Sequence, residues 1–223
     1  MSYGRFCDIP VVLFDFDGTV ADTAHAVITS TRLTLAARGF TPEEMGDLRR
    51  MIGPPLRDSF REFYGFSAEE AEVVADEYRE HFNTMSAADY PVFPGMRELL
   101  DALVARGKRL AVATSRAERK AKTMVAELGL TQFEAVVGMD PAQSRCVKAD
   151  SVRDALKMLD VDPSEAVMVG DRRHDIEGAH AMGVPAIGIY TGGAISGEHE
   201  QAGADAVAHS VDELAALFDI DVR

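Results

Sequence analysis

The amino-acid sequence predicts an α/β fold, in which a doubly wound parallel sheet carries a small inserted α-helical domain. Two patterns indicate this fold. Short apolar runs alternate with helical patterns over most of the chain, whereas one long segment near its start shows helical patterns only. Strands separated by helices pair in parallel through right-handed crossovers. The chain has 223 residues, enough for one large or two small domains with a sizeable core.

The predicted sheet begins with the apolar run Val11–Phe14, which is typical of a buried strand and is followed by a turn at Gly18. Further strands are expected at 109–113, 135–137, 166–169 and 186–190, with a short one near 206–207. Helical patterns occupy 96–104, 118–128, 148–159, 175–182 and 211–218. This alternation predicts that the strands belong to one parallel sheet.

The segment 21–88 contains no convincing strand pattern. Apolar residues recur in it at helical spacing, as between Val27 and Leu35. Glycines and the Gly-Pro-Pro sequence at 53–55 interrupt it, so about four helices are expected. Because the first strand belongs to the sheet, the segment is an insertion. We therefore expect a core domain of residues 1–20 and 89–223, and a helical domain of residues 21–88.

The charge balance excludes some classes of partner. The chain has 23 Lys and Arg against 37 Asp and Glu, a formal net charge of −14. Nucleic acids and anionic membranes attract positive charge, so we predict no nonspecific binding of this protein to either of them. A phosphate substrate stays compatible with this charge, because a bound cation locally reverses the field.

Cysteine usage and the chain termini bear on location. Cys7 and Cys146 form no metal-binding cluster, which favours a reduced interior, although the sequence leaves a disulfide between them open. The first ten residues lack the apolar core of a signal peptide, and no segment reaches the ~20 apolar residues of a membrane span. We predict a cytoplasmic protein.

Two carboxylates follow the first strand, where an open α/β sheet usually binds its ligand. Asp15 and Asp17 lie two residues apart in the sequence Asp-Phe-Asp-Gly-Thr. One such carboxylate can attack while the other carries a proton, and both can face a cation. The alternative is an ordinary turn, since Asp and Gly are common in loops. The motifs further along the chain favour catalysis.

A second acidic pair follows the predicted strand 166–169. Asp171 and Asp175 lie four residues apart across a strand-to-helix turn, so they can share one hard cation with the first pair. The alternative is that Asp175 only caps the helix or favours its first turn. His174 lies between them, but imidazole suits softer metals than magnesium, so we expect a loop histidine.

Thr114 and Ser115 follow the strand 109–113, just before a helix. A hydroxyl and free backbone N–H groups at such a place can bind an anion, or can simply cap the helix. Lys148 is the only one of the five lysines that starts a helix directly after a loop. A lysine there opposes the helix dipole, which disfavours the alternative of an ordinary surface lysine. We favour a side chain directed inward, where it can neutralise the nucleophile and a phosphate together.

We call the four motifs described above the four stations. Their residues and their order along the chain resemble the haloacid dehalogenase-like hydrolase superfamily, and the resemblance covers essentially the whole chain. They are the motif at Asp15, the pair Thr114-Ser115, Lys148, and the Gly-Asp sequence at Asp171. The resemblance implies a Rossmann-like core with an inserted helical cap. The nearest likeness is to the phosphoglycolate phosphatase-like branch, which includes 5′-nucleotidases, through Ile-Gly-Pro-Pro-Leu at 52–56 and the stretch 169–179.

The resemblance also implies a reaction. Asp15 attacks phosphorus and forms an aspartyl-phosphate, while Asp17 serves as general acid and then as general base. Mg²⁺ is held by Asp15, the backbone carbonyl of Asp17, and Asp171, with Asp175 acting directly or through water. Two further groups stabilise the phosphoryl group: Thr114 with the backbone of Ser115, and the catalytic Lys148.

Other reactions of the superfamily fit less well. A dehalogenase needs no acid at Asp17, and no lysine lies between Ala21 and Ala88 to form the Schiff base of a phosphonatase. A β-phosphoglucomutase-like reaction stays open, since it uses the same four stations. Of the arginines in the helical segment, Arg49 and Arg57 flank the Gly-Pro-Pro break and are our candidates for substrate binding; pairing with acids on the helix surface is the alternative.

The sequence predicts a small phosphorylated metabolite as partner, but leaves its identity open. Whether the protein is a monomer or a homodimer also stays open. A phospho-accepting regulatory module is a non-enzyme alternative, but such a receiver needs no helical insertion and gives Asp17 no role. Gly192 and Gly193 follow the last long strand, either as a loop near the site or as a plain turn, and we favour the turn.

Overall fold

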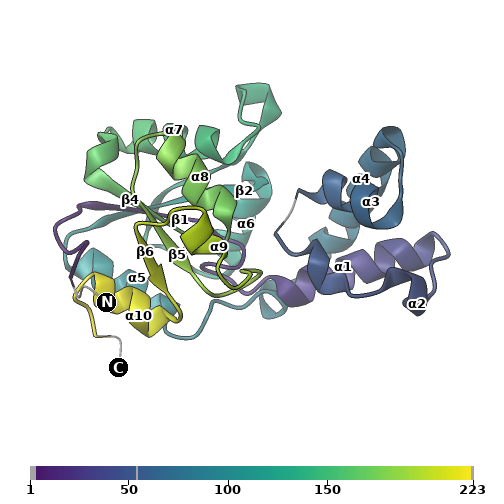
Figure 1. The fold of residues 1–223 in the computed structure, drawn as a ribbon, viewed down its shortest axis with the longest axis horizontal. Coiled ribbons are helices and arrows are strands. Elements are labelled where there is room, and N and C mark those ends of the chain that lie inside the picture. The colour runs from purple at the N-terminus through teal and green to yellow at the C-terminus, as the bar shows by residue number, and fades with distance from the viewer. Residues whose placement is uncertain (1–3, 54, 222–223) are drawn as a thin grey trace. The chain divides into compact units, whose positions relative to one another are not determined.

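The chain forms two compact units, which Figure 1 shows as ribbons. The computed structural model describes residues 4–53 and 55–221. One unit combines the chain up to Asp22 with the chain from Val92 onward, and the other is Thr23–Pro91. That these units are independently folding domains, with boundaries at 20/21 and 88/89, stays a prediction.

The larger unit is built on one parallel sheet. In the described part of the chain the sheet has six strands in the order β3-β2-β1-β4-β5-β6, and every pairing between neighbours is parallel. This arrangement confirms the predicted fold class. The strands are β1 (Val11–Phe14), β2 (Arg109–Ala117), β3 (Phe133–Met139), β4 (Ala166–Gly170), β5 (Ala186–Ile189) and β6 (Ala206–Ala208).

Helices connect the strands of this unit. In Figure 1, α7 and α8 lie on one side of the sheet and α5 and α10 on the other. The helices are α5 (Met96–Ala105), α6 (Glu118–Glu127), α7 (Lys148–Leu159), α8 (Arg173–Ala181), α9 (Glu198–Gln201) and α10 (Val211–Leu217), with 3-10 turns η3 (Pro141–Gln143) and η4 (Pro163–Glu165). The short helix α9 was not expected from the sequence.

Side chains of β1 point alternately to the two faces of the sheet, and both faces are buried. Val11 and Leu13 pack in a buried cluster with Val152 of α7 and Ile176 of α8. Val12 and Phe14 are equally buried and point to the opposite face, as the two-residue period of a strand requires. A strand covered on both faces is continuously apolar, which is why Val11–Phe14 could be recognised in the sequence.

The strand order determines where a site can form. The chain proceeds from β1 to β2 and β3 in one direction and from β4 to β5 and β6 in the other, so the order reverses between β1 and β4. Phe14 lies beside Val169, and the N–H of Asp15 donates to the Val169 carbonyl at 2.8 Å. The residues just after β1 and β4 are therefore neighbours at the switch point, where open α/β sheets bind ligands.

The unit Thr23–Pro91 is helical. Its described residues form four α-helices, as predicted: α1 (Ala24–Ala37), α2 (Pro42–Met45), α3 (Leu56–Tyr64) and α4 (Ala68–Asn83), with 3-10 turns η1 (Leu48–Met51) and η2 (Ala87–Asp89). Thr41 and Ser67 begin α2 and α4 with reciprocal capping boxes. Phe60, Tyr78 and Phe82 are buried in an aromatic cluster between α3 and α4.

Two further findings bear on the sequence-based expectations. Cys7 and Cys146 are both exposed and free, so the disulfide left open above does not form. Among residues 4–53 and 55–221, no helix has both the length and the apolar character needed to cross a membrane.

Truncation of Leu13 in the central strand tests the core. Leu13 is completely buried, so Leu13→Ala should lower the free energy of unfolding by about 2–5 kcal/mol, through lost apolar burial and the remaining cavity. Val104→Ala is the control, because Val104 is 43% exposed and its loss should change stability by less than about 0.5 kcal/mol. Urea unfolding measures both, and equal effects would contradict this packing.

Candidate active site

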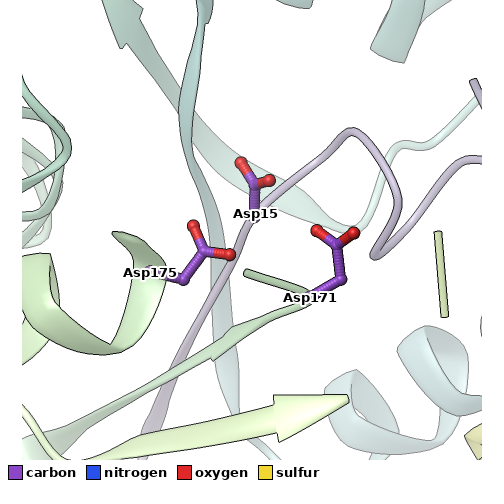
Figure 2. A group of neighbouring side chains, drawn as sticks. All are labelled: Asp15, Asp171 and Asp175. Carbon is purple, nitrogen blue, oxygen red and sulfur yellow. The ribbon is translucent and has the colours of Figure 1, made fainter. Parts of the chain in front are cut away.

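Three carboxylates converge at the carboxyl end of the sheet. Asp15 follows β1, Asp171 follows β4, and Asp175 lies in the first turn of α8. One carboxylate oxygen of each lies within 4.8 Å of the others, and all three residues are buried. Figure 2 shows the three side chains as neighbours at the ends of their strands and at the start of α8. The structure thus brings together three of the four predicted metal ligands.

Lys148 reaches the same group from the first residue of α7. Its Nζ lies 2.7 Å from Asp15 and 2.6 Å from Asp175, and its side chain is only 4% exposed. Gly178 of α8 allows this approach, because a Cβ there would lie 2.8 Å from the Lys148 Cβ. The helix-dipole argument therefore predicted the direction of this side chain correctly.

The carboxylates carry more charge than the lysine neutralises. Burial raises the pKa of Asp15 to about 6, with help from Asp175 and Asp17 and against the attraction of Lys148. Burial also raises the pKa of Asp171 well above its usual value, and the charges of Asp175 and Asp15 add to this. Burial lowers the pKa of the Lys148 ammonium, but the charges of Asp15 and Asp175 outweigh burial and leave it raised. An additional cation would relieve this imbalance.

A glycine-rich segment after β5 packs against Asp171. The Gly193 N–H donates to Asp171 Oδ2 at 3.0 Å, and Thr191 Oγ1 donates to the Gly18 carbonyl at 2.5 Å. Gly18 has a φ of +78°, and a Cβ on it would lie 2.3 Å from Asp171 Oδ2. A Cβ on Gly192 would lie 2.3 Å from the Gly18 Cα. Our preference for a plain turn at Gly192 and Gly193 was therefore wrong, because this turn forms part of the site.

Asp17 has a partner that the sequence analysis missed. Arg116 donates from Nε and Nη2 to the two Asp17 carboxylate oxygens, at 2.7 and 2.6 Å. Such bidentate pairs fix both the position and the orientation of a carboxylate. The Asp17 side chain is 26% exposed and lies outside the three-carboxylate group, so its metal role through the backbone carbonyl stays a prediction. The available signal was an arginine two residues after Thr114.

Thr114 and Ser115 differ from their predicted setting. α6 begins at Glu118 as predicted, but β2 continues to Ala117 instead of ending at residue 113, so Thr114 and Ser115 lie within the strand rather than after it. Thr114 is buried, and its Oγ1 accepts from the Arg116 N–H at 3.2 Å, whereas Ser115 is exposed. Binding of a phosphoryl group by these two residues stays a prediction.

The remaining candidates are Arg49, Arg57 and His174. Arg49 pairs with Asp47 at 2.9 Å and Arg57 with Glu72 at 2.7 Å, all within the helical unit, which is the alternative weighed above. Their role in substrate binding stays a prediction. His174 lies in the first turn of α8 rather than in a loop, because this helix begins two residues earlier than the apolar pattern indicated.

Comparisons with known proteins agree with the fold. Residues 12–189 match the family described as haloacid dehalogenase-like hydrolase. The chain is 34% identical over 209 residues to a 5′-nucleotidase of Pseudomonas aeruginosa, covering 93% of both proteins. It is 33% identical over 189 residues to a phosphoglycolate phosphatase of Agrobacterium fabrum, covering 82% of this chain and 81% of that protein.

Two further matches extend this picture. The tyrosine-protein kinase PtkA of Mycobacterium tuberculosis is 39% identical over 185 residues, which cover 82% of this chain but 62% of that protein. The crystal structure of a predicted phosphatase from Clostridium acetobutylicum superposes with a TM-score of 0.83 at 35% identity, covering 92% of this chain and 95% of that one. The chain belongs to the haloacid dehalogenase-like hydrolases, and within them it is a phosphatase. The regulatory-module alternative is thereby set aside.

The raised pKa of Asp171 predicts an unusual pH dependence of stability. Above the ordinary pKa of 3.8, the folded protein binds this proton more tightly than the unfolded chain, so the contribution of Asp171 to stability is lost as the pH rises through its raised pKa. With metal removed by EDTA at pH 7.5, Asp171→Asn should therefore unfold a few degrees above the wild type. About 2–4 °C corresponds to 1 kcal/mol in a chain of this size.

Thermal unfolding between pH 4 and pH 8 checks this expectation. The advantage of Asp171→Asn should shrink toward pH 4, and added Mg²⁺ should stabilise the wild type more than the variant. A metal-free variant that is less stable than the wild type at pH 7.5 would contradict the proposed charge imbalance.

Proposed function

We propose that the protein is a magnesium-dependent phosphatase that hydrolyses a small-molecule phosphomonoester through an aspartyl-phosphate on Asp15. The observation that carries this proposal is the buried group of Asp15, Asp171 and Asp175 with Lys148 bound to the first of them. A nucleophilic carboxylate, a site for a divalent cation and a fixed ammonium are the main requirements of phosphoryl transfer.

The donor set fits Mg²⁺. The three carboxylates offer hard oxygen ligands close to one another. Their excess negative charge favours the binding of a small divalent cation. Asp15 and Asp171 would hold the ion together with the backbone carbonyl of Asp17, and Asp175 would act directly or through water. When bound, Mg²⁺ neutralises charge on the phosphoryl oxygens and orients them for in-line attack.

The side chains then divide the reaction between them. An Asp15 oxygen bonds to phosphorus as the ester P–O bond breaks, and Asp17 donates a proton to the departing alcohol oxygen. Asp17 next accepts a proton from the water that attacks the aspartyl-phosphate, which releases inorganic phosphate and restores Asp15. Lys148 balances the charge of the phosphoryl group, and Thr114 with the Ser115 backbone contacts its oxygens.

We assign the substrate to the small phosphorylated metabolites, the class that the names of the relatives indicate. Phosphoglycolate is the leading candidate, with a nucleoside 5′-monophosphate as the alternative. Arg49 and Arg57 of the helical unit are the proposed contacts to an anionic substrate. A β-phosphoglucomutase-like transfer uses the same stations and is kept as a further alternative. We keep the cytoplasm as the predicted location and a monomer or homodimer as the predicted state.

A second candidate is transfer of the phosphoryl group to a protein hydroxyl. The identity of 39% to PtkA favours it, because a tyrosine hydroxyl could take the place of water in the second step. The two reactions differ in their products. A phosphatase releases one inorganic phosphate for each alcohol formed, whereas a transferase leaves phosphate on the acceptor.

The nucleophile is tested with p-nitrophenyl phosphate. The wild type should release p-nitrophenol with Mg²⁺ and lose this activity with EDTA, and Asp15→Asn should lower kcat by about 10³-fold or more, since an amide cannot form the acyl-phosphate. Asp17→Asn should also lower turnover strongly. Val104→Ala, purified and assayed in the same way, is the control and should keep wild-type turnover. Near-wild-type activity of Asp15→Asn would show that Asp15 is not the nucleophile.

The substrate class is tested with a panel of phosphorylated metabolites. 2-Phosphoglycolate, nucleoside 5′-monophosphates and hexose phosphates are compared by kcat/KM, with inorganic phosphate measured for each. We expect at least one member to exceed p-nitrophenyl phosphate by about tenfold or more, because contacts beyond the phosphate add transition-state binding. A panel in which no small metabolite exceeds this reference would contradict a small-molecule phosphatase.

A further inference from the structure

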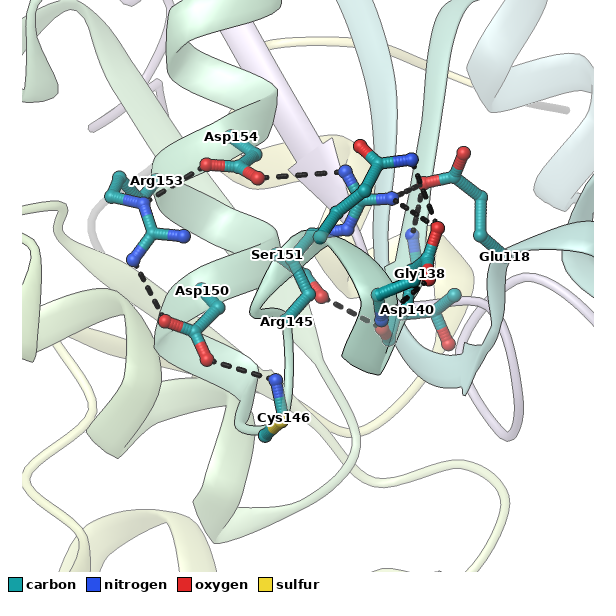
Figure 3. Close-up of polar contacts among 12 residues, drawn as sticks. Glu118, Gly138, Asp140, Arg145, Cys146, Asp150, Ser151, Arg153 and Asp154 are labelled. Atoms are coloured by element: carbon teal, nitrogen blue, oxygen red, sulfur yellow. Dashed lines mark hydrogen bonds and ion pairs between the residues drawn. The ribbon is translucent and has the colours of Figure 1, made fainter.

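A buried arginine lies beside the site without contacting it. The Arg145 side chain is 5% exposed, and its guanidinium faces three carboxylates from three different elements. Nη2 lies 2.5 Å from Glu118 of α6 and 3.6 Å from Asp140 at the end of β3, and Nη1 lies 3.4 Å from Asp154 of α7. We call these four residues the Arg145 cluster; Figure 3 shows it.

The cluster is connected to the N-terminus of α7. Arg153 donates to Asp154 at 2.9 Å and to Asp150 at 2.7 Å, and Asp150 accepts from the N–H groups of Cys146 and Val147 at 3.0 and 3.1 Å. A continuous series of charges therefore runs from Glu118 to the backbone that starts α7, as the dashed lines in Figure 3 trace. The first residue of that helix is Lys148.

Arg145 closes the loop before α7, which begins at Asp140 and ends at Arg145 itself. Backbone N–H groups of Asp140 and Arg145 donate to each other's carbonyls, at 3.1 and 3.0 Å, and close the loop between them. The Arg145 side chain then binds this loop to Glu118. Only Cys146 and Val147 separate Arg145 from Lys148, so little chain is available to absorb a displacement of the loop.

The cluster also reaches the strand that carries Thr114 and Arg116. Glu118 follows directly after β2 and accepts from the Gly138 N–H at 3.4 Å. A Cβ on Gly138 would lie 2.4 Å from the Arg116 carbonyl, so β3 and the end of β2 are in close contact there. Arg145 thus connects the segment that holds Asp17, through Arg116, with the helix that presents Lys148.

Stability alone does not account for this arginine. The free energy lost when a charged cluster is removed from water largely offsets what its ion pairs contribute to stability. In addition, the Arg145 Nε–H is buried without an acceptor among the described residues, which is a further cost. Geometry is the better explanation. We propose that Arg145 is a positioning residue, whose cluster fixes the start of α7 against the end of β2 and so holds the Lys148 ammonium on Asp15; its effect on turnover rests on the proposed function.

The test compares Arg145→Met, which keeps an unbranched apolar stem but removes the guanidinium and its charge, with Arg145→Lys. Lys108→Met is the matched control. Lys108 is also buried, and it donates to the carbonyls of Cys7 and Ile9 at the opposite end of β2, at 2.7 and 2.6 Å. Turnover of p-nitrophenyl phosphate, thermal unfolding and amide hydrogen exchange are measured for each full-length protein.

We expect Arg145→Met to lower kcat about tenfold to a hundredfold, because small displacements of a charged group at a reacting centre have effects of this size. Amide exchange in residues 141–151 should become about tenfold faster or more, while Lys108→Met keeps kcat within about twofold at a comparable loss of thermal stability. Arg145→Lys should recover part of kcat. Should Arg145→Met not fold, Asp154→Asn must show both changes in the same direction, at about threefold or more.

Three results would overturn the proposal. They are unchanged turnover in Arg145→Met, a loss of turnover no greater than that of Lys108→Met, or unchanged exchange in residues 141–151. Failure of the proposed function is separable from these. If the wild-type protein hydrolyses no phosphomonoester, the chemistry is refuted, and hydrogen exchange alone then decides whether Arg145 fixes the start of α7.

Discussion

The organisation of the larger unit depends on the concentration of buried negative charge at one end of its sheet. Three carboxylates gather there with a single ammonium, and burial, together with the repulsion between the carboxylates, raises the pKa of Asp15 and of Asp171. Such a site opposes folding until charge of the opposite sign arrives. A cation that binds only the folded protein stabilises it by mass action, so the imbalance that weakens the metal-free fold would strengthen the proposed binding of Mg²⁺.

Close backbone packing makes this concentration of charge possible. A Cβ on Gly170 would lie 2.2 Å from Asp175 Oδ2, and one on Gly178 would lie 2.8 Å from the stem of Lys148. Glycines at these positions let α8 approach both β4 and α7, so that the acids and the lysine meet. Glycines in a sequence are read first as turn signals, but these two lie in a strand and in a helix, where their role is the close approach of neighbouring groups.

The sequence was informative wherever chain topology alone decides position. Asp15 and Asp171 each follow an apolar run, and parallel strands bring their carboxyl ends to one edge, so their meeting could be predicted from two short patterns. The direction of Lys148 followed from its place at a helix start. Pairings that depend on side-chain reach could not be predicted in this way. Arg116 reaches Asp17 only because β2 continues past Thr114, and no hydrophobic period marks that extension.

The Arg145 cluster shows how such unpredictable contacts can matter for function. A lysine that balances charge on a phosphoryl group is useful only while its ammonium stays within hydrogen-bond distance of the nucleophile, as Lys148 does at 2.7 Å from Asp15. Its side chain begins at the first residue of α7, where a helix end is least constrained by its own hydrogen bonds. Packing against Gly178 fixes one side of this helix end, and the loop closed by Arg145 fixes the approach to it. An apolar residue in place of Arg145 would leave three carboxylates without their shared partner, and their repulsion would act on the segment that leads into Lys148.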